Sequence, residues 1–258
     1  FQFDEWKQDS YVKLTKFEDY QSRDEEASGL AGKKEALVDE VYFRIVTDPS
    51  TRVAGVMSGE YDIIHATPYD YAETIEENPN TENHTVPGSS YILVFNKKQG
   101  LFTDLKAREA ARLALDNGLI MQGAFTNEEY YTLNHNFVMP YLTNQFNTDA
   151  GKSEYETHDP EQAKDMIEEL GYAGEEVVII TTRDYEEQYN ASLVIQQELE
   201  KIGLNVELEV YDWPTLLEKI EDPNAYDLNI MGWGPQPEPT SYGYLRRGYD
   251  SGWADSDE

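Results

Sequence analysis

The chain has 258 residues, and its 51 acidic and 20 basic side chains give a formal net charge of −31 at pH 7. A surface this negative excludes a general nucleic-acid binder or a binder of anionic membranes. The charge suits a protein exposed to high salt or high pH outside a cell, and high solubility alone is the alternative explanation. The absence of cysteine excludes disulfides, thiolate nucleophiles and cysteine–zinc sites, and no apolar run reaches the ~18–20 residues of a membrane-spanning helix.

Residues 1–89 have the pattern of a few strands followed by a helix. Apolar runs predict strands at 1–6, 11–17 and 41–46. Asp48 and Pro49 predict the start of a helix over 50–58, with proline in the first turn. Residues 21–34 are rich in charge, glycine, alanine and serine, which predicts a mobile surface loop.

The next part of the chain begins with residues 90–96, which are apolar on both faces and predict a buried strand. Thr103 is expected to cap a helix that ends near Asn117. The inward face of this helix is expected to hold Leu105, Ala110, Ala111 and Ala114. Residues 126–157 show little periodicity and predict a long irregular excursion, after which Asp159 starts another helix.

Two strand–helix units and a third strand are predicted between residues 176 and 231. Consecutive strands joined by short helical links imply right-handed crossovers and a parallel sheet. Ligands of such sheets bind beyond the carboxyl ends of the strands. Arg183 and Tyr185 follow the first strand, and Trp233 and Gln236 follow the third, so we expect these side chains at one edge.

The sequence lacks the patterns of a catalytic or metal site. The four histidines are scattered without metal-ligand spacing: His65, His84, His135 and His158. There is no glycine-rich phosphate loop and no Gly-x-Ser-x-Gly motif, and neighbouring carboxylates are expected by chance in so acidic a chain. We therefore expect a binding protein with no cofactor and no metal, rather than an enzyme.

Five segments, taken together, carry a family resemblance. They are, in chain order, FQFDEWKQDSYVKLTKFEDY, VYFRIVTDPSTRVAGVMSGEYDII, YILVFNKKQGLFTDLKAREAARLALD, HDPEQAKDMIEELGYAGEE and the stretch 171–242, which contains VVIITTRDY and YDLNIMGWGPQPEP. In this order they resemble the oligopeptide/dipeptide-binding proteins of bacterial ABC importers, the extracellular solute-binding protein family 5. The stretch 171–242 is similar to the second lobe of that family.

The resemblance implies an α/β fold of the periplasmic-binding-protein-like type II class, with two lobes and mixed sheets flanked by helices. Residues 1–89 would be part of the first lobe, 90–232 the second lobe with a crossing strand at each end, and 233–258 a return segment toward the first lobe. Because family members are much longer, the chain is expected to be an internal fragment with only part of the first lobe.

The resemblance also implies a carboxylate-binding residue. In dipeptide-binding members an Arg-x-Tyr motif holds the carboxylate of the peptide, and Arg183-Asp184-Tyr185 matches this motif. A guanidinium suits a carboxylate because its planar fork donates two parallel hydrogen bonds. The alternative is a local salt bridge from Arg183 to Asp184 or Glu186.

Three further positions bear on the ligand site. Trp233 is expected to line the pocket and Tyr91 the floor of the cleft, with core packing as the alternative for both. Many oligopeptide-binding relatives carry, three residues after this tryptophan, an aspartate that pairs with the ligand's α-amino group, but Gln236 stands here. A neutral amide cannot neutralise an ammonium, so either Glu238 substitutes or the ligand lacks a free amine.

The implied function is delivery of di- or oligopeptides to the membrane permease components of an ABC importer. The binding protein would act as a monomer, closing two lobes on the ligand, and would be a lipid-anchored lipoprotein at the cell surface or a periplasmic protein. The alternatives are a binding protein for an oligosaccharide, a nickel chelate or an opine, a peptide-sensing module, and a carbohydrate-active enzyme.

Overall fold

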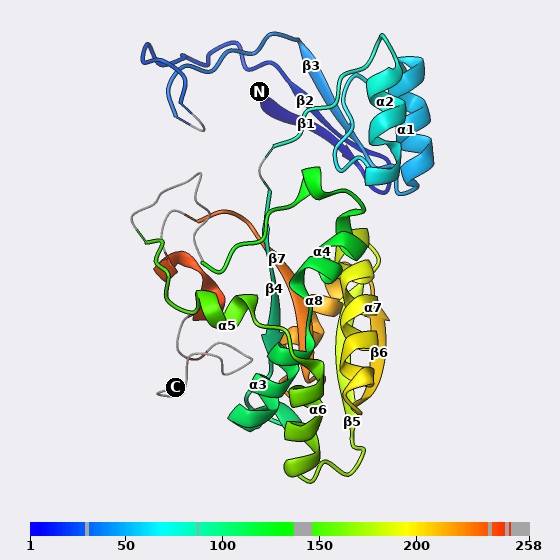
Figure 1. Cartoon of the computed structure of the whole chain (residues 1–258). Coiled ribbons are helices and arrows are strands. Elements are labelled where there is room, and N and C mark those ends of the chain that lie inside the picture. The colour runs from blue at the N-terminus through cyan, green and yellow to red at the C-terminus, as the bar shows by residue number, and fades with distance from the viewer. Residues whose placement is uncertain (29–30, 87, 137–145, 237–238, 246–247, 249–258) are drawn as a thin grey trace. The chain divides into compact units, whose positions relative to one another are not determined.

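The computed structural model of the chain describes residues 1–28, 31–86, 88–136, 146–236, 239–245 and 248. They divide into two units, Phe1–Asn83 and His84–Glu258. Each unit has its own sheet and its own helices (Figure 1). Within the described ranges, no helix has the length and apolar character that crossing a membrane requires.

The sheet of the first unit is a three-stranded antiparallel meander. Its strands, in spatial order, are β1 (Gln2–Lys7), β2 (Tyr11–Thr15) and β3 (Glu40–Arg44). Trp6, Val12 and Phe43 lie directly opposite one another and therefore share a face. Trp6 is 64% exposed and Phe43 59% exposed, so this apolar face is open to solvent within the unit.

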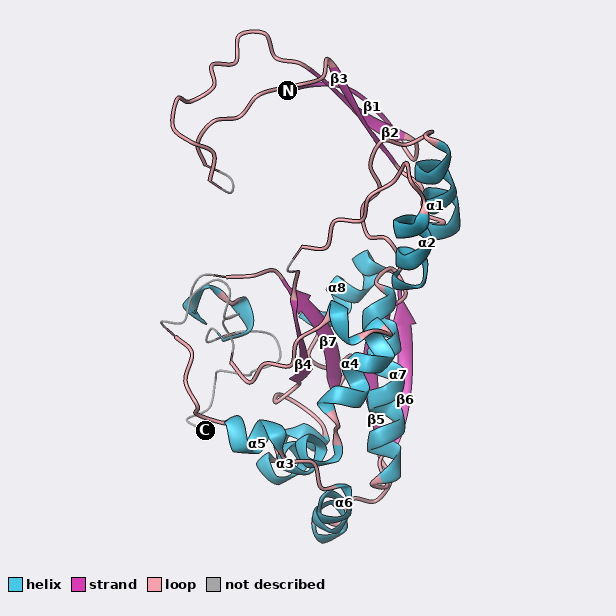
Figure 2. Cartoon of the chain, turned by 45° about the horizontal axis from the view of Figure 1, so that its top comes forward, coloured by secondary structure: helices cyan, strands magenta, loops and turns pink. Residues whose placement is uncertain are grey.

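The connection between β2 and β3 is a long loop (Figure 2). Its two sides are joined by hydrogen bonds from Lys16 N to Asp39 O at 2.8 Å and from Lys34 N to Ser22 Oγ at 2.9 Å. The predicted surface loop at 21–34 lies within it.

The helices of the first unit follow β3. They are α1 (Pro49–Ser58), the 3₁₀ turn η1 (Tyr69–Tyr71) and α2 (Ala72–Glu77). The predicted start of α1 is confirmed, because Asp48 accepts a hydrogen bond from Thr51 N at 2.7 Å. Hydrogen bonds from the hydroxyls of Thr51 and Ser50 lower the pKa of Asp48 to about 2.

The sheet of the second unit has four strands in the order β4-β7-β5-β6. The strands are β4 (Ser90–Phe95), β5 (Glu176–Thr182), β6 (Asn205–Tyr211) and β7 (Leu228–Trp233). β5 pairs in parallel with both β6 and β7, whereas β4 runs antiparallel to β7. The predicted parallel sheet over 176–231 is thus confirmed.

Helices cover both faces of this sheet (Figures 1 and 2). α7 (Glu186–Lys201) lies on one face, where Ser192 Oγ is 2.9 Å from Thr181 Oγ1 of β5. α8 (Trp213–Glu221) lies on the other face, where Leu216 and Ile220 pack with Ile180. The other elements of the unit are η2 (Leu101–Thr103), α3 (Leu105–Ala114), α4 (Asn117–Phe125), η3 (Glu128–Tyr130), α5 (Lys152–Glu156), α6 (Pro160–Glu169), η4 (Pro239–Ser241) and η5 (Gly243–Leu245).

The predicted helix from Thr103 to Asn117 needs three corrections. Asp104, not Thr103, caps α3, since its carboxylate accepts from Lys106 N at 2.7 Å. Leu105 is 45% exposed rather than inward. Asn117 begins a separate helix, α4, which Asp116 caps by accepting from Leu119 N at 3.0 Å.

The charge of the chain predicts a salt-dependent stability. Even if every basic side chain paired with a carboxylate, 31 carboxylates would remain without a counter-charge. We expect the melting temperature at pH 7 to rise between low and molar sodium chloride, because ions screen the repulsion among these groups. The rise should largely disappear near the sequence pI of about 4.3. A flat response at pH 7 would mean that the acidic surface serves solubility only.

Candidate functional site

One edge of the second unit's sheet gathers four of the predicted site residues. β5 and β7 are parallel neighbours, so their carboxyl ends lie at the same edge. β4 runs antiparallel to β7, with Tyr91 opposite Gly232, so the start of β4 lies at this edge too. The residues found here are Tyr91, Arg183, Tyr185 and Trp233.

The guanidinium of Arg183 lies against Tyr189 of α7. Its Cζ is 4.5 Å from the centre of the Tyr189 ring, and Nη2 donates a hydrogen bond to the tyrosine hydroxyl at 2.8 Å. Over the described part of the chain, Arg183 makes no ion pair. The predicted alternative of a salt bridge to Asp184 or Glu186 is therefore not formed. The exposed cation is held by an aromatic ring and keeps donors for another acceptor.

Asp184 and Tyr185 connect this edge to α8. The Asp184 carboxylate accepts a hydrogen bond from Trp213 N at 2.7 Å, at the first residue of α8. The rings of Tyr185 and Trp213 meet edge to face with centroids 4.9 Å apart. Tyr185 remains 40% exposed. In the Arg-Asp-Tyr motif, the aspartate thus fixes a helix start while the arginine faces α7.

Tyr91 links the start of β4 to α7 and α4. Its hydroxyl donates a hydrogen bond to Glu187 Oε1 at 2.7 Å. Its ring meets Phe125 of α4 edge to face, with centroids 5.4 Å apart. Both Tyr91 and Glu187 are half-buried. Tyr91 is therefore partly packed and partly open at this edge.

Trp233 lies on the opposite face of the sheet from Tyr91. Tyr91 shares a face with its partner Gly232, and successive residues of a strand alternate between faces. Trp233 packs against the cluster around Leu216, Ile220 and Met231 under α8 and is half-buried. Core packing thus accounts for part of its surface.

Gln236 contacts residues of the segment that follows β7. Its backbone N–H is 3.4 Å from the hydroxyl of Tyr242, and its Nε2 is 3.5 Å from Gly234 O. Tyr242 is fully buried. Glu238, the predicted substitute for the missing aspartate, lies outside the described residues.

The sheet therefore separates the predicted residues into two groups. Tyr91 and Arg183 contact α7, whereas Tyr185 and Trp233 pack on the side of α8. Glu187 and Tyr189, the two α7 residues that contact the first group, were not among the site residues predicted from the sequence. The sequence offers one indication of these two residues, which is their position at the start of α7, directly after Tyr185.

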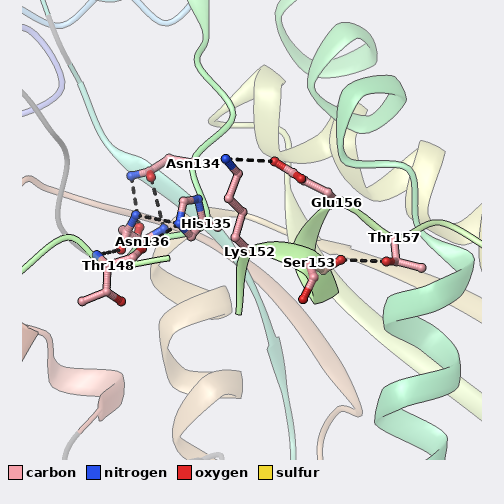
Figure 3. A network of polar contacts seen from close by, with 8 residues as sticks. All are labelled: Asn134, His135, Asn136, Thr148, Lys152, Ser153, Glu156 and Thr157. Carbon is pink, nitrogen blue, oxygen red and sulfur yellow. Dashed lines mark hydrogen bonds and ion pairs between the residues drawn. The ribbon is translucent and has the colours of Figure 1, made fainter. Parts of the chain in front are cut away.

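His135 makes a local contact between two loop segments. Figure 3 shows His135, whose Nε2 is 2.8 Å from Thr148 O, and Asn136, whose Oδ1 accepts from Thr148 N at 2.9 Å. Asn134 Oδ1 accepts from Asn136 N at 3.1 Å. These contacts tie residues 134–136 to Thr148. Over the described ranges, no group of three or more His, Cys, Asp or Glu side chains is arranged to hold a metal ion.

The other contacts in Figure 3 stabilise α5 and its end. Lys152 Nζ and Glu156 Oε1 are 3.8 Å apart, one helical turn from each other. The hydroxyl of Thr157 donates to Ser153 O at 2.6 Å. This network is a local structural feature.

The chain matches one protein family over nearly its whole length. The model of the family described as bacterial extracellular solute-binding proteins, family 5 middle, matches residues 1–255. Among curated proteins, a probable peptide ABC transporter periplasmic-binding protein, y4tO of Sinorhizobium fredii, is 34% identical over 84% of this chain and 41% of its own length. The oligopeptide-binding protein AppA of Bacillus subtilis is 27% identical over 94% of this chain and 44% of its own length. The chain therefore spans less than half the length of these relatives.

Solved structures show the same fold. The B. subtilis AppA complex with a nonapeptide aligns with a TM-score of 0.73 at 23% identity, over 98% of this chain and 51% of that one. AgaA from A. tumefaciens R10, in complex with agropinic acid, aligns with a TM-score of 0.66 at 27% identity, over 89% of this chain and 44% of that one. The predicted family resemblance and the predicted two-lobed, type II periplasmic-binding-protein class are confirmed, with this chain covering about half of that fold.

Proposed function

Because the chain belongs to the bacterial extracellular solute-binding proteins of family 5, we propose that the protein carrying it binds peptides and delivers them to an ABC importer. In this proposal two lobes close on a di- or oligopeptide about the strands that cross between them. The protein acts by binding and release, without a catalytic residue or a cofactor. The proposed ligand-binding residues are Tyr91, Arg183, Tyr185, Trp233, Gln236 and Glu238.

The observation that carries the proposal is the state of Arg183. The cation lies at the carboxyl edge of a parallel sheet, where ligands of such sheets bind. It rests on Tyr189 and has no ion pair over the described residues. A guanidinium with free donors at such an edge suits the carboxylate of a peptide. The name of the y4tO relative, a probable peptide transporter component, agrees with this ligand class.

The lobe assignment is part of the proposal. Residues 1–89 contribute part of the first lobe, 90–232 form the second lobe, and 233–258 return toward the first. β4 and β7 are the proposed crossing strands. Their pairing supports this assignment, because every residue of β4 has a partner in β7.

The proposed location is outside the cytoplasmic membrane, as the names of the relatives suggest. There the protein would be lipid-anchored at the cell surface or free in the periplasm, and would act as a monomer that docks on the permease. Its charge of −31 is consistent with this location in a high-salt or high-pH environment.

A second candidate ligand is a small carboxylic acid other than a peptide. The AgaA structure, 27% identical to this chain, contains agropinic acid. An arginine fork binds a carboxylate whatever molecule carries it. Arg183 would serve both ligand classes in the same way.

Identification of the bound molecule tests the proposal. We expect mass spectrometry of solutes released from the purified full-length protein to find peptides. Titration calorimetry should then give tight binding of the released peptide and much weaker binding of its C-terminal amide. An oligosaccharide serves as the control and should not bind. Release of an oligosaccharide, and binding of that sugar alone, would overturn the peptide assignment.

A further inference from the structure

The carboxylate of Glu187 on α7 lies at the proposed ligand edge. Glu187 is the second residue of α7 and is half-buried. The hydroxyl of Tyr91, from the start of β4, donates to its Oε1 at 2.7 Å. A tyrosine from a strand 96 residues away thus fixes the position of this carboxylate.

Among the residues that the structure describes, the hydroxyl of Tyr91 is the one polar partner of the Glu187 carboxylate. No cationic side chain there forms an ion pair with this carboxylate. Arg183, four residues earlier, is likewise held by a tyrosine and makes no ion pair. Two opposite charges thus lie at this edge, four residues apart in the sequence, and neither forms an ion pair within the described residues. Such an arrangement suits a ligand that carries both charges itself.

A second acceptor stands next to Glu187. Gln188 is 3% exposed, and its Oε1 has no hydrogen-bond donor among the described residues. A buried acceptor without a donor is unfavourable. The first turn of α7 therefore carries two acceptor side chains in succession, of which the charged one is half-buried and the neutral one is buried. An ammonium group, with three N–H donors, is the chemical partner for a carboxylate that keeps an acceptor oxygen.

We propose that Glu187 binds the ammonium group of a zwitterionic ligand whose carboxylate is held by Arg183. This inference rests on the proposed function and adds the amine as a required part of the ligand. Tyr91 acts as a positioning residue, since it holds the carboxylate through Oε1 and leaves Oε2 for the ligand.

The test compares a short peptide with its N-acetylated form by titration calorimetry on the full-length protein. Glu187→Gln keeps an acceptor for Tyr91 but removes the charge. It should weaken binding of the free peptide at least about tenfold, since a hydrogen bond to a charged group is lost. Binding of the acetylated peptide, weak from the start, should not change further. Glu186→Gln removes the same charge from the preceding, exposed residue of α7 and is the matched control, expected to bind both peptides like wild type.

Tyr91→Phe keeps the ring and removes the hydroxyl, so it should weaken the free peptide selectively and by less. The assignment is overturned if Glu187→Gln weakens both peptides equally, or if Glu238→Gln rather than Glu187→Gln causes the selective loss. Wild type that binds neither peptide would overturn the proposed function itself. Wild type that binds both equally would overturn the amine requirement alone.

Discussion

Replacing Arg183 with alanine is expected to weaken binding of a peptide with a free carboxylate by about 30-fold or more. The reason is that a carboxylate left without its partner in a closed, water-poor site costs ~2–5 kcal/mol, at ~1.4 kcal/mol per tenfold change in affinity. Titration calorimetry on the full-length protein measures the effect. The C-terminal amide of the same peptide should bind wild type poorly and lose little more from the substitution.

The contacts of Arg183 predict that its loss leaves the fold intact. The substitution removes a stacking contact and a hydrogen bond with Tyr189, both at an exposed position. Exposed cation–π contacts are worth ~0.5–1 kcal/mol, so the melting temperature should barely change.

Asp184, the neighbouring residue, supplies a control that is expected to change stability. Asp184→Ala removes the acceptor for Trp213 N at the start of α8 and should lower the melting temperature. A large loss of stability in Arg183→Ala with unchanged affinity would contradict the carboxylate assignment.

The sequence predicted the central β-α-β-α-β region because the signals there are local. The run 177–180 is apolar on both faces, and β5 is indeed flanked by α7 and α8. Asp212 caps α8 by accepting from Thr215 N at 2.9 Å. Each signal is contained in a few neighbouring residues, and short links leave few ways to connect them.

The start of α4 shows where local signals fail. Asn117-Gly118 is a common helix end, but here it follows a two-residue break at Leu115 and Asp116 and begins a new helix. The packing of α4 against α7 decides between the two outcomes. That packing depends on residues far away in the sequence, such as Glu198 of α7, whose Oε2 accepts from Asp116 N at 2.9 Å.

The candidate site was predictable in its location and not in its contacts. Strand order alone places Arg183 and Trp233 at one edge. The register of β4 on β7 decides that Tyr91 faces α7 while Trp233 faces α8, and a shift of β4 by one residue would bring Tyr91 to the α8 face as well. The pairing of Tyr91 with Glu187 follows from this register and has no signal in either segment.

Gly100→Ala is expected to destabilise the second unit by ~3–5 kcal/mol. Gly100 has φ 71° and ψ −163°, a region that costs other residues ~1–3 kcal/mol. A Cβ added there would lie 2.1 Å from Oδ1 of Asp227, so the carboxylate would have to move. Moving it would break its hydrogen bond from Val178 N, 2.8 Å long, at a further ~1.5–3 kcal/mol.

Asp227 has little freedom to give way. It is 5% exposed, and burial raises the pKa of its carboxyl above the ordinary value. Its backbone N–H donates to Val178 O, and its carbonyl accepts from Asn96 N, both at 2.9 Å. Asn96 is itself fixed, because its Nδ2 donates to Tyr226 O at 2.8 Å. The clash therefore falls on residues that join β4, β5 and β7 at their far ends from the ligand edge.

The melting temperature of Gly100→Ala should fall by roughly 6–20 °C, at ~2–4 °C per kcal/mol for a chain of this size. Gly151→Ala is the control in the same unit. Gly151 also has a positive φ of 73°, but nothing lies within 4 Å of an added Cβ. Only the left-handed backbone then opposes the substitution, at ~1–2 kcal/mol. If the two variants melt at the same temperature, the carboxylate of Asp227 moves freely and the junction of β4, β5 and β7 does not depend on it.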